Sequence, residues 1–229
     1  MLDKIAQETH YLIGTKQALS DLENKDHARL LVISDSHNRY QTFKNIVLQF
    51  GKTCDALIFC GDGIGDLVHL LSETLINDEL KNCTPSVIAF ARGNGDPSSY
   101  PLNMKESIYV PNSQILKVNG RNFLIVHGHR EEIDYGMENL GLAMQLADCK
   151  TAFYGHSHIA KEENIDGYKF VNPGSCARPR GGQPAGFAIA TVEKNFVDIA
   201  FLKEIIQDGK QGFTIWNPIF QSKSAFSQT

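Results

Sequence analysis

Two short segments each carry a pair of metal-binding side chains two residues apart, Asp35-Ser36-His37 and His156-Ser157-His158. Each segment follows a short apolar run, which predicts that each pair lies where a buried strand ends and its backbone opens into a loop. Residues i and i+2 of extended backbone point the same way, so we expect both side chains of a pair to face one site. Carboxylate oxygens and imidazole nitrogens are common ligands of divalent metals. The two segments therefore predict a metal site assembled from several strand ends.

Further polar residues follow the other predicted strands of the first half. Three apolar segments, 29–34, 56–60 and 86–91, alternate with helical patterns, which predicts parallel strand–helix–strand units. Asp62 follows the second segment and Asn94 follows the third. Ligands of such sheets bind beyond the carboxyl ends of the strands, which is where these side chains fall.

The second half of the chain has a hairpin pattern instead. Asn119-Gly120 and Asp166-Gly167 are turn signals between apolar runs, and a third hairpin is predicted over residues 186–202. The first of these hairpins runs into His127 and His129. The pattern predicts a second, more antiparallel sheet that packs face to face with the first, with helices outside both.

Composition and charge exclude several classes of protein. Of the 229 residues, 42% are hydrophobic and 21% are charged, which is ordinary for a globular chain with a sizeable core. The net charge of −4 and the lack of a Lys/Arg block disfavour a long nucleic acid as partner. The five cysteines are scattered without a CxxC motif, which disfavours a disulfide scaffold and fits a reducing cytosol. Neither a signal peptide nor an apolar run of about 18 residues is present, so we expect a soluble cytoplasmic protein without a membrane partner.

The chain is expected to hold one domain, because it has no Pro/Gly/Ser-rich linker. We divide it into an N-terminal helical extension (1–28), the main domain (29–206) and a C-terminal tail (207–229). Within the extension, residues 3–24 show a weak amphipathic pattern that predicts a helix. The tail is apolar enough to dock but carries no motif.

Five short motifs occur in an order that resembles a known family. They are Asp-x-His at 35, Gly-Asp at 61, Gly-Asn at 93, the histidine at 127 and Gly-His-x-His at 155. This series resembles the calcineurin-like metallophosphoesterases, and most closely their small bacterial and archaeal phosphodiesterase branch, which includes a metal-poor retromer subunit. The segment Asn172-Pro173-Gly174-Ser175 and the later Pro179-Arg180-Gly181-Gly182 are also similar to that branch. The resemblance covers residues 30–202.

The resemblance implies a four-layer α/β/β/α sandwich with two mixed β-sheets packed face to face and helices on the outer faces. It also implies two divalent metal ions that share one carboxylate. One ion would be held by Asp35, His37, Asp62 and His158, and the other by Asp62, Asn94, His127 and His156. Two ions against two carboxylates leave a charge of about +2, which attracts a phosphate ester. A hydroxide that bridges the ions, ~3.5–4 Å apart, would attack phosphorus directly.

Ligation by oxygen and imidazole without thiolate suits Mn²⁺, Fe, Ni²⁺ or Zn²⁺, among which manganese is our first expectation. One departure from the family concerns catalysis. Many members carry a histidine where this chain has Gly95, in Gly93-Asn94-Gly95-Asp96. A general acid typically contributes ~10²–10⁴-fold, so we expect slow turnover or a preference for good leaving groups unless His129 substitutes.

Several residues keep alternative interpretations. Asn94, His127 and His129 are the catalytic candidates, although His129 could equally be a partner of a ligand or a plain loop residue. Arg180 could bind substrate phosphate through its planar fork, or could be a surface arginine. Gly95 leaves room for a leaving group. Asp96 caps a turn or orients a ligand, and turn chemistry is the simpler interpretation.

Two classes of function compete. The first is a metal-dependent phosphodiesterase acting on a small phosphoester, with a phosphomonoesterase or a nuclease as variants of the same chemistry. The second is a catalytically weak or inactive binding or scaffold protein, because a fold does not fix a function. A scaffold needs no metal ligands, and this chain has the full set, so the enzyme is favoured. A homo-oligomer is left open.

Overall fold

The computed structural model describes residues 5–103 and 106–218. Its six-stranded sheet has the order β13-β12-β11-β1-β2-β3. Strands β1 to β3 are parallel, and β11 to β13 add to β1 in antiparallel fashion. The bounds are β1 (Ala28–Ile33), β2 (Ala56–Phe59), β3 (Val87–Phe90), β11 (Gly186–Val192), β12 (Val197–Gln207) and β13 (Lys210–Trp216).

The second sheet has five strands in the order β6-β7-β8-β10-β9. Its bounds are β6 (Ser113–Val118), β7 (Arg121–Val126), β8 (Thr151–Phe153), β9 (Lys161–Ile165) and β10 (Tyr168–Asn172). The expectation of a second, more antiparallel sheet is wrong at its centre, because β7, β8 and β10 run parallel and only the edge pairs are antiparallel. The third predicted hairpin, β11–β12, joins the first sheet instead.

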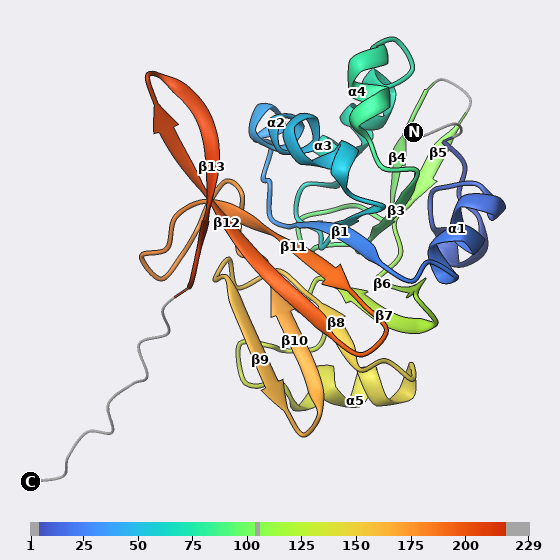
Figure 1. Cartoon of the computed structure of the whole chain (residues 1–229), viewed down its shortest axis with the longest axis vertical. Coiled ribbons are helices and arrows are strands. Elements are labelled where there is room, and N and C mark those ends of the chain that lie inside the picture. The colour runs from blue at the N-terminus through green and yellow to red at the C-terminus, as the bar shows by residue number, and fades with distance from the viewer. Residues whose placement is uncertain (1–4, 104–105, 219–229) are drawn as a thin grey trace, which may run out of the picture.

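Helices lie on the outer faces of both sheets (Figure 1). They are α2 (Tyr40–Phe50), α3 (Ile64–Glu73) and α4 (Asp78–Cys83) beside the first sheet, and α5 (Glu138–Leu146) beside the second. The N-terminal helix is α1 (Lys16–Glu23). The other elements are two 3-10 turns, η1 (Thr9–Tyr11) and η2 (Gly51–Thr53), and a small two-stranded sheet of β4 (Ser99–Pro101) and β5 (Ser107–Tyr109). The predicted α/β class with two mixed sheets is confirmed.

Alternate side chains of a strand point to opposite faces of the sheet and belong to different apolar clusters. In β1, Leu31 and Ile33 belong to the apolar cluster under α2 and α3, whereas Leu30 and Val32 belong to the cluster that also contains Phe153 of the second sheet. A third cluster joins the outer face of the second sheet to α5. Both faces of β1 are therefore buried, which explains its unbroken apolar sequence.

The N-terminal segment covers an edge of the first sheet. Ile13 exchanges two backbone hydrogen bonds with Ile88 of β3, at 3.0 and 2.8 Å. Thr15 then caps α1 by accepting a hydrogen bond from the Ala18 amide at 3.1 Å. The prediction of one helix over 3–24 is wrong for the described residues, because pairing of Ile13 with an otherwise open strand edge competes with helix and delays its start.

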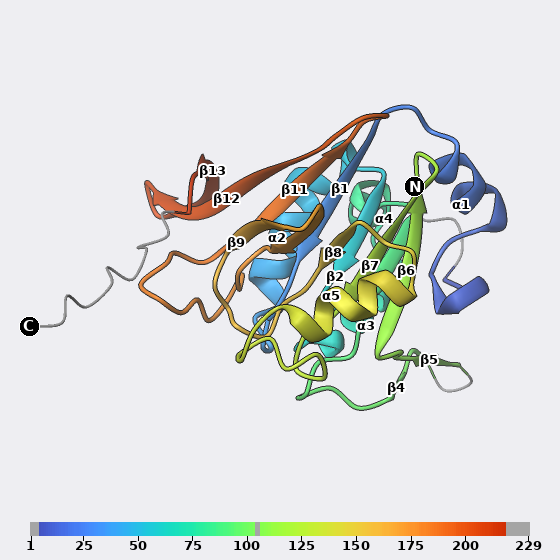
Figure 2. The ribbon, with the colours of Figure 1, turned by 90° about the horizontal axis from the view of Figure 1, so that it is seen from below.

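The C-terminal part of the first sheet is a long hairpin of β12 and β13, which extends past the other strands (Figure 2). Phe213 packs its ring against Phe187 and Phe50, with centroids 5.2 and 5.9 Å apart. Residues 210–216 of the predicted tail are therefore part of the sheet, and Phe220 lies outside the described residues. The division of the chain at 28 and 206 stays an interpretation. In the described ranges, no helix is long and apolar enough to cross a membrane.

Candidate metal centre

The seven predicted ligand residues follow the carboxyl ends of strands from both sheets. Asp35 and His37 follow β1, Asp62 follows β2 and Asn94 follows β3. From the second sheet, His127 follows β7, and His156 and His158 follow β8. The prediction that the Asp35/His37 and His156/His158 pairs each lie where a buried strand opens into a loop is confirmed.

One group of side chains gathers around the carboxylate of Asp35. His158 Nε2 lies 3.2 Å from Asp35 Oδ1 and 3.0 Å from His37 Nε2. His37 Nε2 lies 3.9 Å from both Asp35 Oδ1 and Asp62 Oδ2. The ligand atoms of Asp35, His37 and His158 lie within 4.8 Å of one another, so they could hold one ion.

A second group of the same kind consists of Asp35, Asp62 and His127. His127 Nε2 lies 3.6 Å from Asp62 Oδ2. Asp35 is therefore common to both groups, whereas the resemblance implies Asp62 as the shared ligand. Asp62 Oδ2 nevertheless faces both His37 and His127, so both carboxylates lie between the two groups of imidazoles.

Asn94 and His156 lie beside the second group. Asn94 Oδ1 is 3.1 Å from His156 Nδ1, and the His156 and His127 rings are 5.2 Å apart between centroids. His156 belongs to neither of the two tight groups. The structure thus brings all seven predicted residues to one end of the two sheets, with His156 and Asn94 at the rim.

Two of the imidazoles are oriented by backbone carbonyls. The Nδ1 atoms of His127 and His158 lie 2.6 Å from the carbonyl oxygens of Cys60 and Arg178. A carbonyl can only accept, so each Nδ1 carries a proton and donates it. Each neutral ring then presents its Nε2 lone pair toward the carboxylates, the orientation that outer partners give to metal-binding histidines.

The donor atoms fit a cation because some of them lack any other partner. Asp35 Oδ1 and His127 Nε2 are buried and, among the residues that the structure describes, have no hydrogen-bond partner. Burying such acceptors without a partner costs about 1–3 kcal/mol each. A set of converging oxygen and imidazole acceptors is complementary to a divalent ion of the kind expected from the sequence.

Most of the predicted ligands have left-handed backbone. The φ angles are 54° for Asp35, 43° for His37, 55° for Asp62, 67° for His156 and 58° for His158. Residues other than glycine adopt this region at a cost, and such strain clusters at functional sites. The argument from extended backbone is therefore wrong, because the chain leaves the extended conformation at the first residue of each pair. His158 points to Asp35 while His156 points to Asn94, so the second pair diverges.

Asp96 joins two of the ligand loops. Its carboxylate accepts hydrogen bonds from four backbone amides at 2.7–3.1 Å, those of Asp62, Gly63, Ile64 and Gly93. It therefore orients the loop that presents Asp62, in addition to closing its own turn. In the sequence, the only signal for this role is an acidic residue two positions after Asn94. The interpretation of Asp96 as a turn residue alone is therefore incomplete.

Glycines allow the loops to approach one another closely. A Cβ atom on Gly93 would lie 2.1 Å from Asp62 Oδ1, and one on Gly155 would lie 2.1 Å from Ser34 Oγ and 2.7 Å from Asp35 Oδ2. Ser34 in turn donates a hydrogen bond to Asp35 Oδ2 at 2.6 Å. The glycines next to the ligands are thus required by space, not only by turns.

Electrostatics couple the carboxylates to the imidazoles. Burial opposes ionisation of Asp62, but the charge of the nearby His127 ring and the hydrogen bond from the Gly95 amide hold the pKa of Asp62 well below its usual range. Burial likewise opposes protonation of His127 and His158, and the negative charges of the nearby Asp62 and Asp35 carboxylates outweigh it and raise the pKa of both rings. For His37, burial dominates and lowers the pKa. A bound metal ion would compete with protonation of these imidazoles.

The remaining predicted residues surround this cluster. His129 is half-buried, with ring centroids 5.4 Å from His127 and 6.1 Å from His156. Burial lowers the pKa of His129 to about 4, and the neighbouring rings of His127 and His156 act in the same direction. The Gly95 amide donates to Asp62 Oδ1 at 2.8 Å. Arg180 is exposed, and its amide donates to the His158 carbonyl at 3.1 Å.

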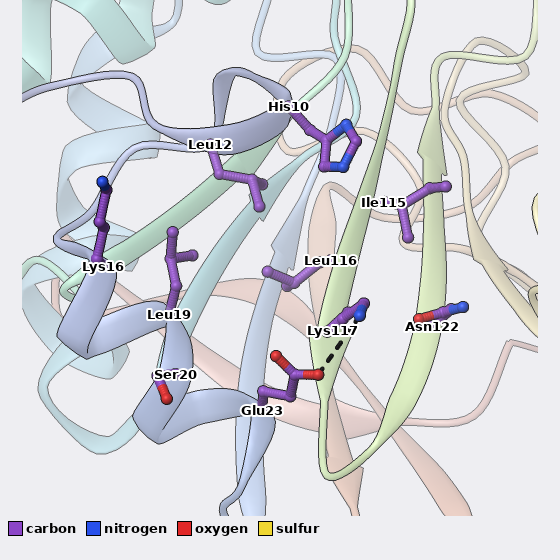
Figure 3. Close-up of a pocket in the computed structure, with 10 residues that line it drawn as sticks. All are labelled: His10, Leu12, Lys16, Leu19, Ser20, Glu23, Ile115, Leu116, Lys117 and Asn122. Atoms are coloured by element: carbon purple, nitrogen blue, oxygen red, sulfur yellow. Dashed lines mark hydrogen bonds and ion pairs between the residues drawn. The ribbon is translucent and has the colours of Figure 1, made fainter.

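Two cavities have walls that the predicted ligands do not form. One, of about 430 Å³, lies between α1 and β6, where Leu12, Leu19 and Leu116 meet Lys16 and Lys117 (Figure 3). The other lies along α5 and the β9–β10 hairpin. Among the described residues that line them, none is one of the seven predicted ligands.

The family of the chain follows from this fold and this arrangement of polar side chains. The calcineurin-like phosphoesterase superfamily domain matches residues 29–195, and the chain belongs to this family. The resemblance inferred from the five ordered motifs is thereby confirmed.

Relatives of the chain are small metallophosphoesterases. It is 27% identical over 174 residues to the probable metallophosphoesterase YsnB of Bacillus subtilis, covering 75% of this chain and 89% of YsnB. It is 28% identical over 167 residues to the phosphodiesterase YfcE of Escherichia coli K12, covering 70% of this chain and 86% of YfcE. Vacuolar protein sorting 29 of Cryptosporidium parvum superposes with a TM-score of 0.62 at 17% identity, covering 84% of this chain and 98% of that chain. This last likeness shows the fold alone.

Proposed function

We propose that this protein is a metal-dependent phosphodiesterase that hydrolyses a small phosphodiester in the cytoplasm. The observation that carries the proposal is the convergence of acceptor atoms without partners, Asp35 Oδ1 and His127 Nε2, with the carboxylate of Asp62. Such converging acceptors are complementary to cations. Relatives named phosphodiesterase favour a diester as substrate.

The proposed centre holds two divalent ions, with manganese as the first choice. Its ligands are Asp35, His37, Asp62 and His158 for one ion and Asp62, Asn94, His127 and His156 for the other. When bound, such a pair supplies a hydroxide nucleophile at neutral pH and stabilises the charge on the phosphoryl oxygens.

The residues of the chain then bind and orient the substrate. The Asp62 carboxylate is fixed by the Gly95 amide, so the loop above it is set before substrate arrives. Gly95 carries no side chain, which is proposed to leave space for a leaving group. Arg180, on the exposed loop beside His158, is proposed to contact a phosphate oxygen.

His129 is not suited to donate a proton at neutral pH, because a pKa of about 4 leaves its ring neutral there. We propose that it acts as a neutral hydrogen-bond partner near the leaving group. Without an acid, hydrolysis depends on the stability of the leaving group, and a good leaving group is favoured.

The experiment compares bis-p-nitrophenyl phosphate with p-nitrophenyl phosphate after chelation and re-addition of Mn²⁺, Ni²⁺, Zn²⁺ or Mg²⁺. We expect diester cleavage that returns with metal and is lost in Asp62→Ala, while Asp166→Ala, in a distant exposed turn, retains it. Faster monoester cleavage would change the substrate class. A folded protein without turnover under any metal would contradict the proposal and favour a binding or scaffold protein, because a fold does not fix a function.

A further inference from the structure

The loop that follows β7 places a carboxylate against one of the proposed ligands. Asp134 Oδ2 lies 3.2 Å from His156 Nε2, and the other ring nitrogen, Nδ1, lies 3.1 Å from Asn94 Oδ1. Asp134 itself belongs to neither of the two tight groups, and 60% of its side chain is exposed. Its contact with His156 therefore needs an explanation outside the ligand set.

An ionised carboxylate can only accept a hydrogen bond, so the proton of the neutral His156 ring is on Nε2 when Asp134 is its partner. The lone pair of the ring is then on Nδ1 and points at the Asn94 carbonyl oxygen. Two acceptor atoms at 3.1 Å repel each other unless a donor or a cation lies beside them. The arrangement is complementary to a metal ion held jointly by Asn94 and His156.

We propose that Asp134 is a positioning residue that fixes His156 as its Nε2–H tautomer and so makes Nδ1 the nitrogen that faces the metal. This proposal rests on the proposed metal centre. His127 and His158 have the opposite arrangement, with Nδ1–H donated to a carbonyl and Nε2 directed inward. The centre then uses two kinds of outer partner, backbone carbonyls on its buried side and a side-chain carboxylate at the rim.

The loop is built so that Asp134 reaches His156. Its neighbour Ile133 is buried and donates a backbone hydrogen bond to the Gly128 carbonyl at 3.3 Å. The Ile133 side chain packs over Gly128, where an added Cβ would lie 3.1 Å from it. Asn139, five residues after Asp134, donates to the carboxylate of Glu132, two residues before it, at 3.1 Å. Asp134 is therefore held between two anchored positions, which reduces the entropy lost when it contacts His156.

The direct test is the tautomer of His156 in metal-free protein, measured by long-range ¹H–¹⁵N correlation spectra of the imidazoles. The His156 signals are assigned by their loss in His156→Gln. Wild-type protein is expected to show the Nε2–H tautomer, and Asp134→Ala and Asp134→Asn are expected to shift the ring toward a mixture. Asp166→Asn is the matched control, because it removes one carboxylate from an exposed turn and should leave the His156 signals unchanged.

A second readout is the affinity for Mn²⁺, measured by calorimetry on the full chain. Changing a partner of a metal-ligating histidine typically costs ~10–100-fold in metal affinity, which is the loss expected for the weaker of the two ions in both Asp134 variants. Backbone amide spectra verify that each variant is folded, and Asp134→Asn preserves the shape of the side chain if Asp134→Ala does not fold.

An Nδ1–H tautomer in the wild type, or unchanged spectra and unchanged affinity in both variants, would overturn the role of Asp134. The failure of the proposed function looks different. Wild-type protein that binds no ion, yet shows the Nε2–H tautomer and loses it in Asp134→Ala, would refute the metal centre and retain the assignment of Asp134 to the ring.

Discussion

The buried and the exposed sides of the proposed metal centre are held in different ways. On the buried side, the side chains of Asp35 and His127 are fully inaccessible, and their partners are backbone groups and Ser34. On the exposed side, His156 is 23% accessible and its partner Asp134 is 60% accessible. The difference suggests that the buried side is fixed by the fold itself, whereas the exposed side depends on one surface loop. Substitutions should therefore have unequal consequences.

The largest effect is expected on the buried side. Asp35→Asn removes the carboxylate that is common to both groups of ligand atoms, so metal-dependent activity should fall by more than ~100-fold, the upper end for changing only a partner of a ligand. His156→Gln should remove one ion and retain the other. Metal-dependent activity and the metal content after equilibrium dialysis are measured for both variants. Equal losses of activity and metal in the two variants would contradict the distinction between the buried and the exposed side.

The close approach of loops on the buried side predicts a loss of stability. In Gly155→Ala, the new methyl group would lie 2.1 Å from Ser34 Oγ, and such overpacking costs ~1–3 kcal/mol. Denaturant unfolding of the metal-free protein measures this. Gly141→Ala in α5 is the control, since its methyl group would lie 3.8 Å from the Phe170 ring, an ordinary contact, and alanine favours a helix. Unfolding free energies that are equal for both variants would contradict the packing argument.

Metal affinity should depend on pH because the raised pKa values of His127 and His158 make protons compete with the ions. Affinity is expected to fall as the pH is lowered through these values, by about tenfold per pH unit for each proton displaced. The stability of the metal-free protein depends on pH in the opposite direction. Because the folded-state pKa of His127 is raised, protonation of its ring stabilises the fold below the unfolded value of 6.5, and this stabilisation is lost as the pH rises through the folded-state pKa. Calorimetric affinities that do not change with pH would refute the coupling.

The smallest effect is expected far from both sides, between α2 and α3. Glu73 accepts hydrogen bonds from Lys44, at 2.5 Å, and from Tyr40, and these lower the pKa of Glu73 to about 2. Its stabilising contribution is present above the unfolded value of 4.5 and is lost as the pH falls toward 2. Glu73→Gln should therefore lower the thermal midpoint slightly at neutral pH, with a difference that shrinks in acid and with unchanged metal content. A shift that grows in acid would contradict this.

Sequence patterns predicted much of the molecule because they report local physics. Unbroken apolar runs predicted β1 and β2, whose faces are both buried, and the turn signal Asn119-Gly120 predicted the β6–β7 hairpin. The ordered motifs predicted which side chains meet. These features depend on neighbouring residues or on an order along the chain that can be read directly.

The remaining features depend on contacts between distant segments. The left-handed backbone of Asp35 and His158, the pairing of Ile13 with β3 and the addition of β11 and β12 to the first sheet are fixed by tertiary packing. The contact of Asp134 with His156 joins two loops of different strands, and no local pattern marks an exposed aspartate as the partner of a histidine 22 positions away.

Anomalous diffraction from a crystal grown with Mn²⁺ tests the central claim most directly. The account predicts two peaks, ~3.5–4 Å apart, one beside Asp35, His37 and His158 and the other beside Asn94, His127 and His156. A manganese-saturated crystal without a peak at these side chains would contradict the metal centre and, with it, the proposed hydrolysis of phosphodiesters.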